Sequence, residues 1–318
     1  MDFEPSVDPS SPSFHAPPPE GTFSKIFLND KGMRAGWRLL IYAALVAGFG
    51  FCGLAALQQF VSPPRGVFSL GYWLPFEVIS FTLVFAAALI MAQIESRPSG
   101  VYGLPLSGAF GKLFWQGCFI GLVEISALIG LIAAFGGYSF GEIALHGGAL
   151  LRWGITWAVL FIFVGLFEEF LFRGYTQYTL AESIGFWPAA IILSLLFGRV
   201  HLGNPGENWA GAAGVVMIAL VFAFALRRTG NLWLVVGWHA SFDFGETFLY
   251  SVPNSGIVFQ GHLSSASLHG AAWLTGGTVG PEASVFSFLM MGILALVVHL
   301  LFPARNTAAA LKQSNPAN

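Results

Sequence analysis

Charged side chains are scarce in this chain of 318 residues, in which Asp, Glu, Lys and Arg together make up 9%. A soluble domain carries roughly 25% charged residues, because its surface must be hydrated. Hydrophobic residues account for 55% of the chain, and its mean hydropathy is +0.71. The composition therefore excludes a water-soluble globular enzyme and favours a protein that exposes apolar surface to lipid.

Cysteine and clustered basic residues are also scarce. The two cysteines, Cys52 and Cys118, lie in apolar runs and show neither a disulfide framework nor a zinc-binding spacing. We therefore expect both of them to be small residues of the core. The net charge is -2 and no basic cluster occurs, which argues against nucleic acid as a partner. The zinc-binding pattern His-Glu-x-x-His is absent as well.

Apolar stretches separated by segments rich in proline and glycine follow the first 36 residues. Most of them approach the ~20 residues that a helix needs to cross ~30 Å of hydrocarbon. They are continuous rather than alternating, which argues against a membrane barrel. The sequence therefore predicts an all-α polytopic membrane protein, a bundle of about eight transmembrane helices. The stretches are 39–61, 72–94, 114–135, 153–175, 186–201, 209–226, 232–250 and 285–302, of which 186–201 is the shortest.

The predicted organisation has five parts. The first is a flexible cytoplasmic tail, because its prolines, serines and acids cannot bury enough apolar surface to order themselves. It is followed by the first three transmembrane helices, a core of four helices, an extracytoplasmic loop, and the last transmembrane helix with its tail. The corresponding ranges are 1–36, 37–152, 153–250, 251–284 and 285–318.

The orientation follows from Lys and Arg outside the predicted spans. With eight spans, both termini and the even-numbered loops share one side, and that side carries most of these residues. Only Arg65 and Arg152 fall on the opposite side. We therefore expect both termini to be cytoplasmic. The residues on the terminal side are Lys25, Lys31, Arg34, Arg38, Arg97, Lys112, Arg227, Arg228, Arg305 and Lys312.

Ionisable residues also occur inside the apolar runs. At mid-membrane a charge costs at least ~2.5–3.5 kcal/mol, so each needs a partner or a function. For Glu77 and Glu124, which have no partner evident in the sequence, we expect a structural or cavity-lining role. The residues are Glu77, Glu124, Glu168, Glu169, Arg173, Arg199, His201, His239, Asp243, Glu246 and His299.

The segment Glu168-Glu169-Phe-Leu-Phe-Arg173 places two acids and a base on one helix. Glu169 and Arg173 are four residues apart and can pair on one face. Glu168 points roughly 140° away from Arg173. We therefore expect Arg173 to hold Glu169 ionised and Glu168 to remain an unpaired carboxylate suited to a general base.

Two further patterns contain histidine. Phe197-Gly-Arg-Val-His201 ends one run, and His239-Ala-Ser-Phe-Asp243 places His and Asp on one face of another. Histidine can act as a base, a donor or a metal ligand, and the carboxylate four residues on can fix its tautomer. A single His–Asp pair is more often a packing contact, and a Glu–Arg pair can be purely structural. Their combination on three helices favours a functional site.

The ordered motifs EEFLFR at 168–173, FGRVH at 197–201 and HASFD at 239–243 resemble those of one family. It is the CPBP family, which contains CAAX prenyl proteases of the Ras-converting type and bacteriocin-processing or self-immunity proteins, also called Abi. The resemblance covers about residues 155–250 and makes 153–250 a CPBP-like catalytic core. Asp243 is less familiar in its motif than Asn.

The resemblance implies an intramembrane endopeptidase with eight helices, acting on a peptide or lipidated-peptide substrate at a polar cavity within the lipid bilayer. Glu168 and His201 would activate a water molecule. His239 and Asp243 would position that water or stabilise the tetrahedral oxyanion. In a bacterial inner membrane, prenylated substrates are not expected, so bacteriocin-like peptide processing or self-immunity is favoured.

The same resemblance implies that Glu169 and Arg173 brace the site. Members of the family are often named metalloproteases, and the cofactor is left open between a metal-free mechanism, which we prefer, and Zn. If a metal binds, the candidate ligands are His201, His239 and Glu168, because two histidines and an acid can form a catalytic zinc site.

Two other functions fit the intramembrane charges. A proton-coupled transporter would use Glu77, Glu124, Glu168 and Asp243 as a relay, but it would predict inverted repeats, and no matching motif links 39–135 with 153–250. A non-catalytic self-immunity or scaffold protein of the same fold is the other alternative.

The predicted spans carry one geometric conflict. A fourth span that starts at Trp153 places Glu168 ~22 Å from one membrane face, and a fifth that starts at Phe186 places His201 ~22 Å from the other. In a ~30 Å membrane the two depths differ by about 14 Å, which is too far for one shared water. Either the fourth helix is displaced or tilted, or the fifth begins well below the surface.

Overall fold

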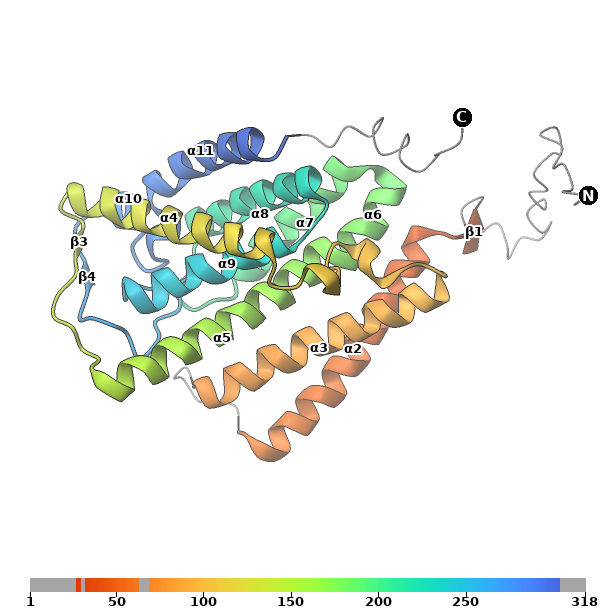
Figure 1. Cartoon of the computed structure of the whole chain (residues 1–318), viewed down its shortest axis with the longest axis horizontal. Coiled ribbons are helices and arrows are strands. Elements are labelled where there is room, and N and C mark those ends of the chain that lie inside the picture. The colour runs from red at the N-terminus through yellow and green to blue at the C-terminus, as the bar shows by residue number, and fades with distance from the viewer. Residues whose placement is uncertain (1–26, 30–31, 63–68, 304–318) are drawn as a thin grey trace, which may run out of the picture.

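The computed structural model describes residues 27–29, 32–62 and 69–303. Most of the predicted N-terminal tail, and residues 304–318 of the predicted last part, lie outside these ranges. Each predicted apolar run contains a helix, and the chain is an all-α polytopic membrane protein (Figure 1). These helices are α2 (Ala35–Phe60), α3 (Leu70–Ile94), α4 (Lys112–Ala134), α5 (Gly147–Leu171), α7 (Phe186–His201), α8 (Trp209–Thr229), α9 (Trp233–Phe244) and α11 (Val285–Leu301).

Within the described residues, five helical segments are long and apolar enough to cross a membrane: α2, α3, α4, the run that begins with α5, and α8. The helices α7 and α11 are shorter, with 16 and 17 residues. The helix α9 has 12 residues and is extended by a π-helical turn, η4 (Gly245–Leu249). The described residues therefore contain the eight expected helices, but three of them are short for a full crossing.

A helix that the apolar runs did not predict follows α5. The chain continues through a π-helical turn, η3 (Phe172–Thr176), into α6 (Gln177–Ile184). Hydropathy overlooks α6 because Gln177, Thr179 and Glu182 give it a polar face. It ends at Gly185, whose φ of 88° lies in the region that glycine favours.

The helix α9 lies at the centre of the molecule, between α4 and α5 (Figure 1). Its contact with α4 depends on glycine. A Cβ atom on Gly117 of α4 would lie 1.9 Å from the Leu234 carbonyl oxygen, and one on Gly237 of α9 would lie 2.2 Å from the Phe114 carbonyl oxygen. Small residues that let two backbones approach closely are a common device of membrane helices. This packing fixes α9, the helix that carries His239 and Asp243.

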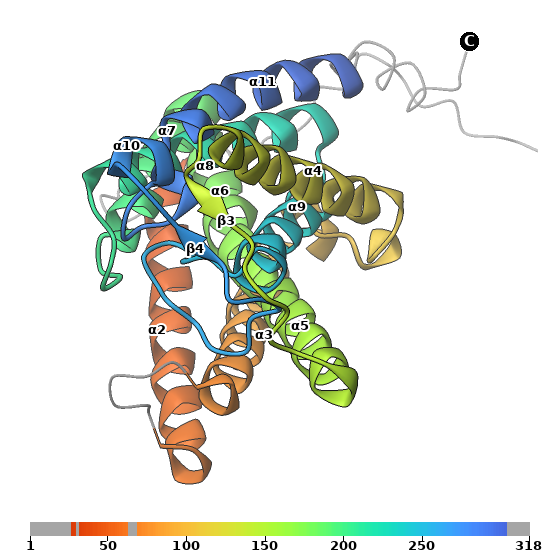
Figure 2. The same ribbon diagram turned by 90° about the vertical axis from the view of Figure 1, so that its left-hand side faces the viewer.

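Short elements complete the described chain. β3 (Tyr138–Ser139) pairs antiparallel with β4 (Ser267–Leu268), and β1 (Leu28–Asn29) pairs in the same way with β2 (Gly32–Met33). Figure 2 shows β3 and β4 at the end of the bundle that faces the viewer. The other short elements are η1 (Ser99–Tyr102), η2 (Leu106–Gly108), α10 (Ala272–Thr275) and η5 (Pro281–Ala283).

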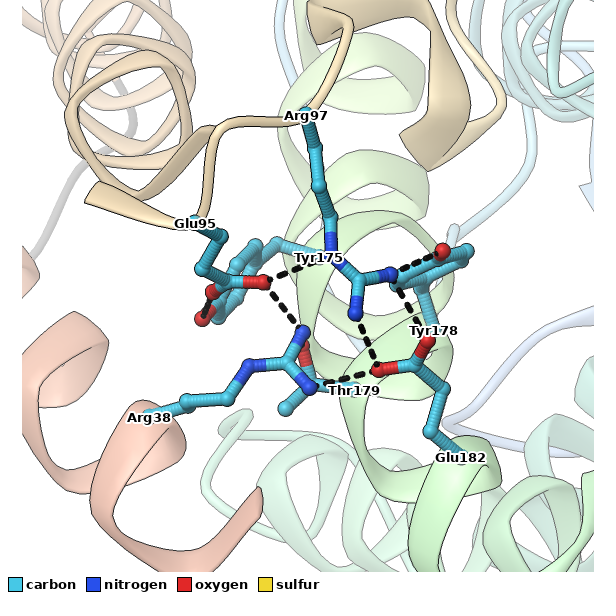
Figure 3. A network of polar contacts seen from close by, with 7 residues as sticks. All are labelled: Arg38, Glu95, Arg97, Tyr175, Tyr178, Thr179 and Glu182. Carbon is cyan, nitrogen blue, oxygen red and sulfur yellow. Dashed lines mark hydrogen bonds and ion pairs between the residues drawn. The ribbon is translucent and has the colours of Figure 1, made fainter. Parts of the chain in front are cut away.

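Seven residues form a polar cluster where α2, α3 and α6 meet, here called the α2–α3–α6 cluster (Figure 3). Arg38, which the orientation argument placed outside the spans, lies in the first turn of α2, and its side chain is only 7% exposed. It pairs with Glu95 and Glu182, and Arg97 also pairs with both acids. The cluster therefore balances two arginines against two glutamates. Its members are Arg38, Glu95, Arg97, Tyr175, Tyr178, Thr179 and Glu182.

Candidate active site

A cavity of about 240 Å³ lies among α3, α4, α5, α7, α8, α9, α11 and the 251–284 segment. Glu168, His201, His239 and Asp243, which come from all three motifs, line it together. Much of the remaining wall is apolar, as at Phe161. Enclosed pockets with an apolar wall and a few convergent polar groups are the usual form of a small-molecule or active site.

The unpredicted helix α6 removes the conflict over the depths of Glu168 and His201. The fourth helical run does not end near residue 175 but continues to Ile184. About 24 Å of helical path, kinked at Gly174, therefore separates Glu168 from the turn at Gly185, and α7 then returns about 22 Å from Phe186 to His201. The two residues line one cavity because α7 begins well beyond the point that the apolar runs indicated.

Glu169 and Arg173 form the i, i+4 ion pair that the spacing predicts. The Arg173 Nη1–Glu169 Oε2 distance is 2.8 Å, and the two side chains are 3% and 0% exposed. The guanidinium also lies over the rings of Phe197 in α7 and Phe222 in α8, at 5.0 and 5.6 Å from the centroids. Arg173 thus connects α5 with the two helices on the far side of the cavity.

His239 is the point at which the acids converge. Its Nδ1 donates to Glu169 Oε1 at 2.9 Å, because an ionised carboxylate can only accept. Its Nε2 lies 3.5 Å from Asp243 Oδ2 and 3.8 Å from Glu168 Oε2. The sequence pattern assigned the orienting role to Asp243, whereas the hydrogen bond comes from Glu169. One carboxylate therefore holds both Arg173 and His239.

Glu168 is the acid of the double-Glu motif that faces the cavity. Its side chain is 25% exposed, while that of Glu169 is 0% exposed. The two neighbouring carboxylates have different environments because they lie on different faces of α5. One is fixed by a permanent cation, and the other is accessible to whatever enters the cavity.

His201 lies at the end of α7 and faces the cavity from the other side. Its Nδ1 is 2.9 Å from the Phe197 carbonyl oxygen, which can only accept, so this nitrogen carries the hydrogen. The neutral ring then has its lone pair on Nε2. Packing against Phe197, with ring centroids 4.5 Å apart, fixes the orientation of the ring.

The cavity is also lined by acids that belong to none of the three motifs. Glu77 and Glu124 line it, as a cavity-lining role requires, and Glu124 Oε2 accepts from Trp238 Nε1 at 2.5 Å. Glu282 lines it too, from η5. Glu282 is the only acid in the 251–284 segment. Its position just before the last apolar run was the one feature of the sequence that could have marked it as a cavity residue.

The candidate zinc ligands do not gather into a coordination site. In the described part of the chain, His201, His239 and Glu168 do not bring three donor atoms within 4.8 Å of one another. His239 also directs Nδ1 at Glu169 rather than into the cavity. This arrangement does not fit a three-ligand zinc site of the catalytic type.

In the described part of the chain, one group of three residues does bring its oxygen atoms within 4.8 Å of one another, and all three residues are acids. It is formed by Asp243, Glu246 and Glu282. Burial, together with the charge of Asp243, raises the pKa of Glu282 to about 7.

The family model described as type II CAAX prenyl endopeptidase Rce1-like matches residues 150–245. This segment runs from α5 to the first residue of η4 and contains all six predicted site residues. The match confirms the family that the three motifs indicate. No curated protein and no solved structure matches the chain.

Proposed function

We propose that this chain, a member of the CAAX prenyl protease family through residues 150–245, is an intramembrane endopeptidase whose catalytic groups are the four polar residues of the cavity. The observation that carries the proposal is that Glu168, His201, His239 and Asp243 come from three separate helices and line one cavity. A general base, a second base and a donor around one cavity are the parts that water-dependent peptide hydrolysis needs.

In the proposed reaction, Glu168 and His201 hold a water molecule, and Glu168 takes its proton. The resulting hydroxide attacks the carbonyl carbon of the scissile peptide bond. His239, with a proton on Nε2, donates to the oxyanion that forms, and Asp243 keeps this nitrogen directed at the cavity. Glu168 then passes its proton to the amide nitrogen, the C–N bond breaks, and a carboxylate and an amine leave.

Glu169 and Arg173 act as positioning residues in this scheme. They do not reach the cavity wall but fix the ring of His239 from behind, through the hydrogen bond to Nδ1. Preorganised donors at a developing oxyanion are typically worth about 3–4 kcal/mol, so their fixed orientation matters to the rate.

The proposed substrates are peptides held at the membrane, such as bacteriocin-like or lipidated peptides. The cavity supports this choice because apolar side chains, among them Leu160, Phe161 and Ile218, surround the polar groups. An apolar side chain next to the cleaved bond of a peptide would pack against these apolar residues.

The proposed orientation places both termini in the cytoplasm of a bacterial cell with the protein in its inner membrane. The loops before and after α8 lie at opposite ends of the bundle, as expected if successive helices cross the membrane in opposite directions. Leu232 N donates to Gly103 O at one end of the bundle, and Gly206 N donates to Gly256 O at the other. Arg97, Arg228 and Lys112 lie near the first of these ends, which would be the cytoplasmic one.

The test is cleavage of a peptide library by the purified chain in detergent micelles. Replacing Glu168 by Gln keeps the shape and removes the base, so cleavage should fall about 10²- to 10⁴-fold. His239→Ala should have an effect of the same order. Glu142→Gln, the same change at an exposed acid outside the cavity, is the control and should leave cleavage unchanged.

Unchanged cleavage in Glu168→Gln and His239→Ala would refute the catalytic assignment. Absence of cleavage by the wild-type chain on any peptide would instead favour the non-catalytic alternative. A proton flux into liposomes that depends on Glu77 and Glu124 would favour the transporter.

A further inference from the structure

Three carboxylates meet at the edge of the cavity without a permanent cation among them. Asp243 is in the last turn of α9, Glu246 is in the π-helical turn η4 that follows, and Glu282 is in η5, before α11. One oxygen atom from each lies within 4.8 Å of the others. In the described part of the chain, no arginine or lysine forms an ion pair with them.

Glu246 distinguishes this group from an ordinary cluster of acids. The residue is 0% exposed, and in the described part of the chain neither oxygen of its carboxylate has a hydrogen-bond donor. A buried carboxylate without a donor or a cation is strongly unfavourable, and native proteins avoid it. The carboxyl group of Glu246 therefore needs either a proton, which it can share with Glu282, or a cation that binds beside it.

The other two acids are anchored so that they leave oxygen atoms available. Glu282 Oε2 accepts from Ser255 N at 3.1 Å and from Ser255 Oγ at 2.9 Å. Asp243 Oδ2 lies 3.5 Å from His239 Nε2. Both carboxylates are thus held by neighbouring protein groups, and each still brings one oxygen within 4.8 Å of the other members of the group.

The backbone near Glu282 is shaped to bring the three acids together. Gly280 has a φ of 112°, and a Cβ atom there would lie 2.2 Å from the Pro253 carbonyl oxygen. Glycine is the residue that adopts this conformation without strain and without that clash. The close approach packs Gly280 against Pro253, in the chain that follows η4, and the same Cβ atom would lie 3.5 Å from Glu246 Oε1.

We propose that Asp243, Glu246 and Glu282 bind one divalent cation of the hard, oxygen-preferring class, such as Mn²⁺, Mg²⁺ or Ca²⁺. Bonds of these cations to oxygen are about 2.0–2.6 Å long, so ligands on opposite sides are about 4–5 Å apart, in agreement with the separations found here. A donor set made only of carboxylates suits such cations. The site lies beside the proposed catalytic group and shares Asp243 with it, but cation binding does not require that the chain cleave peptides.

The experiment uses the full-length chain in detergent, stripped with EDTA and dialysed. Mn²⁺ is then added, and the free ion is followed by electron paramagnetic resonance. The wild-type chain should bind one Mn²⁺, and excess Mg²⁺ or Ca²⁺ should displace it. Glu246→Gln and Glu282→Gln should each weaken binding at least tenfold. Glu77 is a buried acid of the same cavity that lies outside the group, so Glu77→Gln should bind Mn²⁺ as the wild type does.

Thermal unfolding separates loss of the site from loss of the fold. Mn²⁺ should raise the unfolding temperature of the wild type but not that of Glu246→Gln. In EDTA, Glu246→Gln should unfold no lower than the wild type, because the substitution removes a buried charge next to two others.

Failure of the wild type to bind Mn²⁺, or equal binding by Glu246→Gln, would overturn the proposal and indicate that the three acids share protons instead. The cleavage assay is read separately. Mn²⁺ binding without cleavage would contradict the proposed function alone, and cleavage without Mn²⁺ binding would contradict the cation site alone.

Discussion

The α2–α3–α6 cluster and the cavity are both polar regions inside an apolar bundle, yet their charges are arranged differently. In the cluster, two arginines face two glutamates, and tyrosine and threonine hydroxyls surround them (Figure 3). In the cavity, acids outnumber cations, and the described part of the chain gives no donor to Glu77 Oε2 in its wall or to the carboxylate of Glu246 at its edge. Buried charges that are paired can be structural, whereas an excess of one sign requires a ligand, a proton or a substrate.

This difference separates what holds the molecule together from what it does. The cluster closes the junction of α2, α3 and α6, and its members come from three distant parts of the sequence. The cavity depends on α9, whose close packing against α4 requires glycine. We therefore expect charge substitutions in the cluster to change stability and those in the cavity to change chemistry or binding.

The largest effect on stability should come from Arg38→Ala. It leaves Glu95, whose side chain is 8% exposed, without its main partner. Removing one member of a buried ion pair costs about 3–5 kcal/mol, so the free energy of unfolding should fall by that amount, measured by thermal or denaturant unfolding in micelles. Cleavage per folded molecule should stay the same.

Two comparisons test the cause of that loss. Arg227→Ala removes an exposed arginine that lies over the Phe186 ring and should cost less than about 1 kcal/mol. Replacing both Arg38 by Met and Glu95 by Gln should recover much of the stability, because no uncompensated charge remains. A double variant as unstable as Arg38→Ala would contradict the explanation.

The same substitution should have opposite signs in the two regions. Glu95→Gln removes one of the two acids that pair with Arg38 and should lower the free energy of unfolding. Glu77→Gln removes a carboxylate whose Oε2 has no donor and should raise it by about 1 kcal/mol. Thermal unfolding of the two variants, side by side and without added metal, checks this. Destabilisation of similar size in both would mean that the cavity acids are paired as well as those of the cluster.

The smallest effect is a pH dependence at the edge of the cavity. The pKa of Glu282 is raised by burial from 4.5 to about 7, with Asp243 adding to the shift and His201 opposing it. A carboxyl group whose pKa is higher in the folded state adds stability below pH 4.5, and this stability is lost as the pH rises through about 7. In EDTA, the unfolding temperature should therefore fall between these pH values.

Glu282→Gln provides the control, since glutamine does not titrate. Its unfolding temperature should change less over the same pH interval than that of the wild type. Equal slopes would show that Glu282 is not the group responsible.

Local rules predicted a large part of this molecule. Continuous apolar runs indicated each of the apolar helices, because lipid requires long uninterrupted hydrophobic segments. The i, i+4 rule gave the Glu169–Arg173 pair. The order of the motifs indicated the family that residues 150–245 match. The catalytic roles of the cavity residues and the orientation in the membrane remain predictions.

The features that the sequence did not reveal depend on contacts between distant segments. The polar face of α6 turns toward α2 and the end of α3, so its hydropathy does not mark it as a buried helix. The hydrogen bond of Glu169 with His239 joins residues 70 positions apart. The contact of Glu282 with Asp243 and Glu246 requires the 251–284 segment to fold back over the end of α9.

The sequence by itself determined that this is an all-α membrane protein with its ionisable groups concentrated in a few helices, because composition and helical periodicity are local properties of the chain. Tertiary structure alone decided which of those groups meet across different helices. Helix packing brings Glu168 and His201 into one cavity, gives His239 its partner in Glu169, and leaves three acids together without a cation. Such juxtapositions depend on helix lengths, turns and close glycine contacts, whose effects add up over the whole bundle and cannot be read from any single segment.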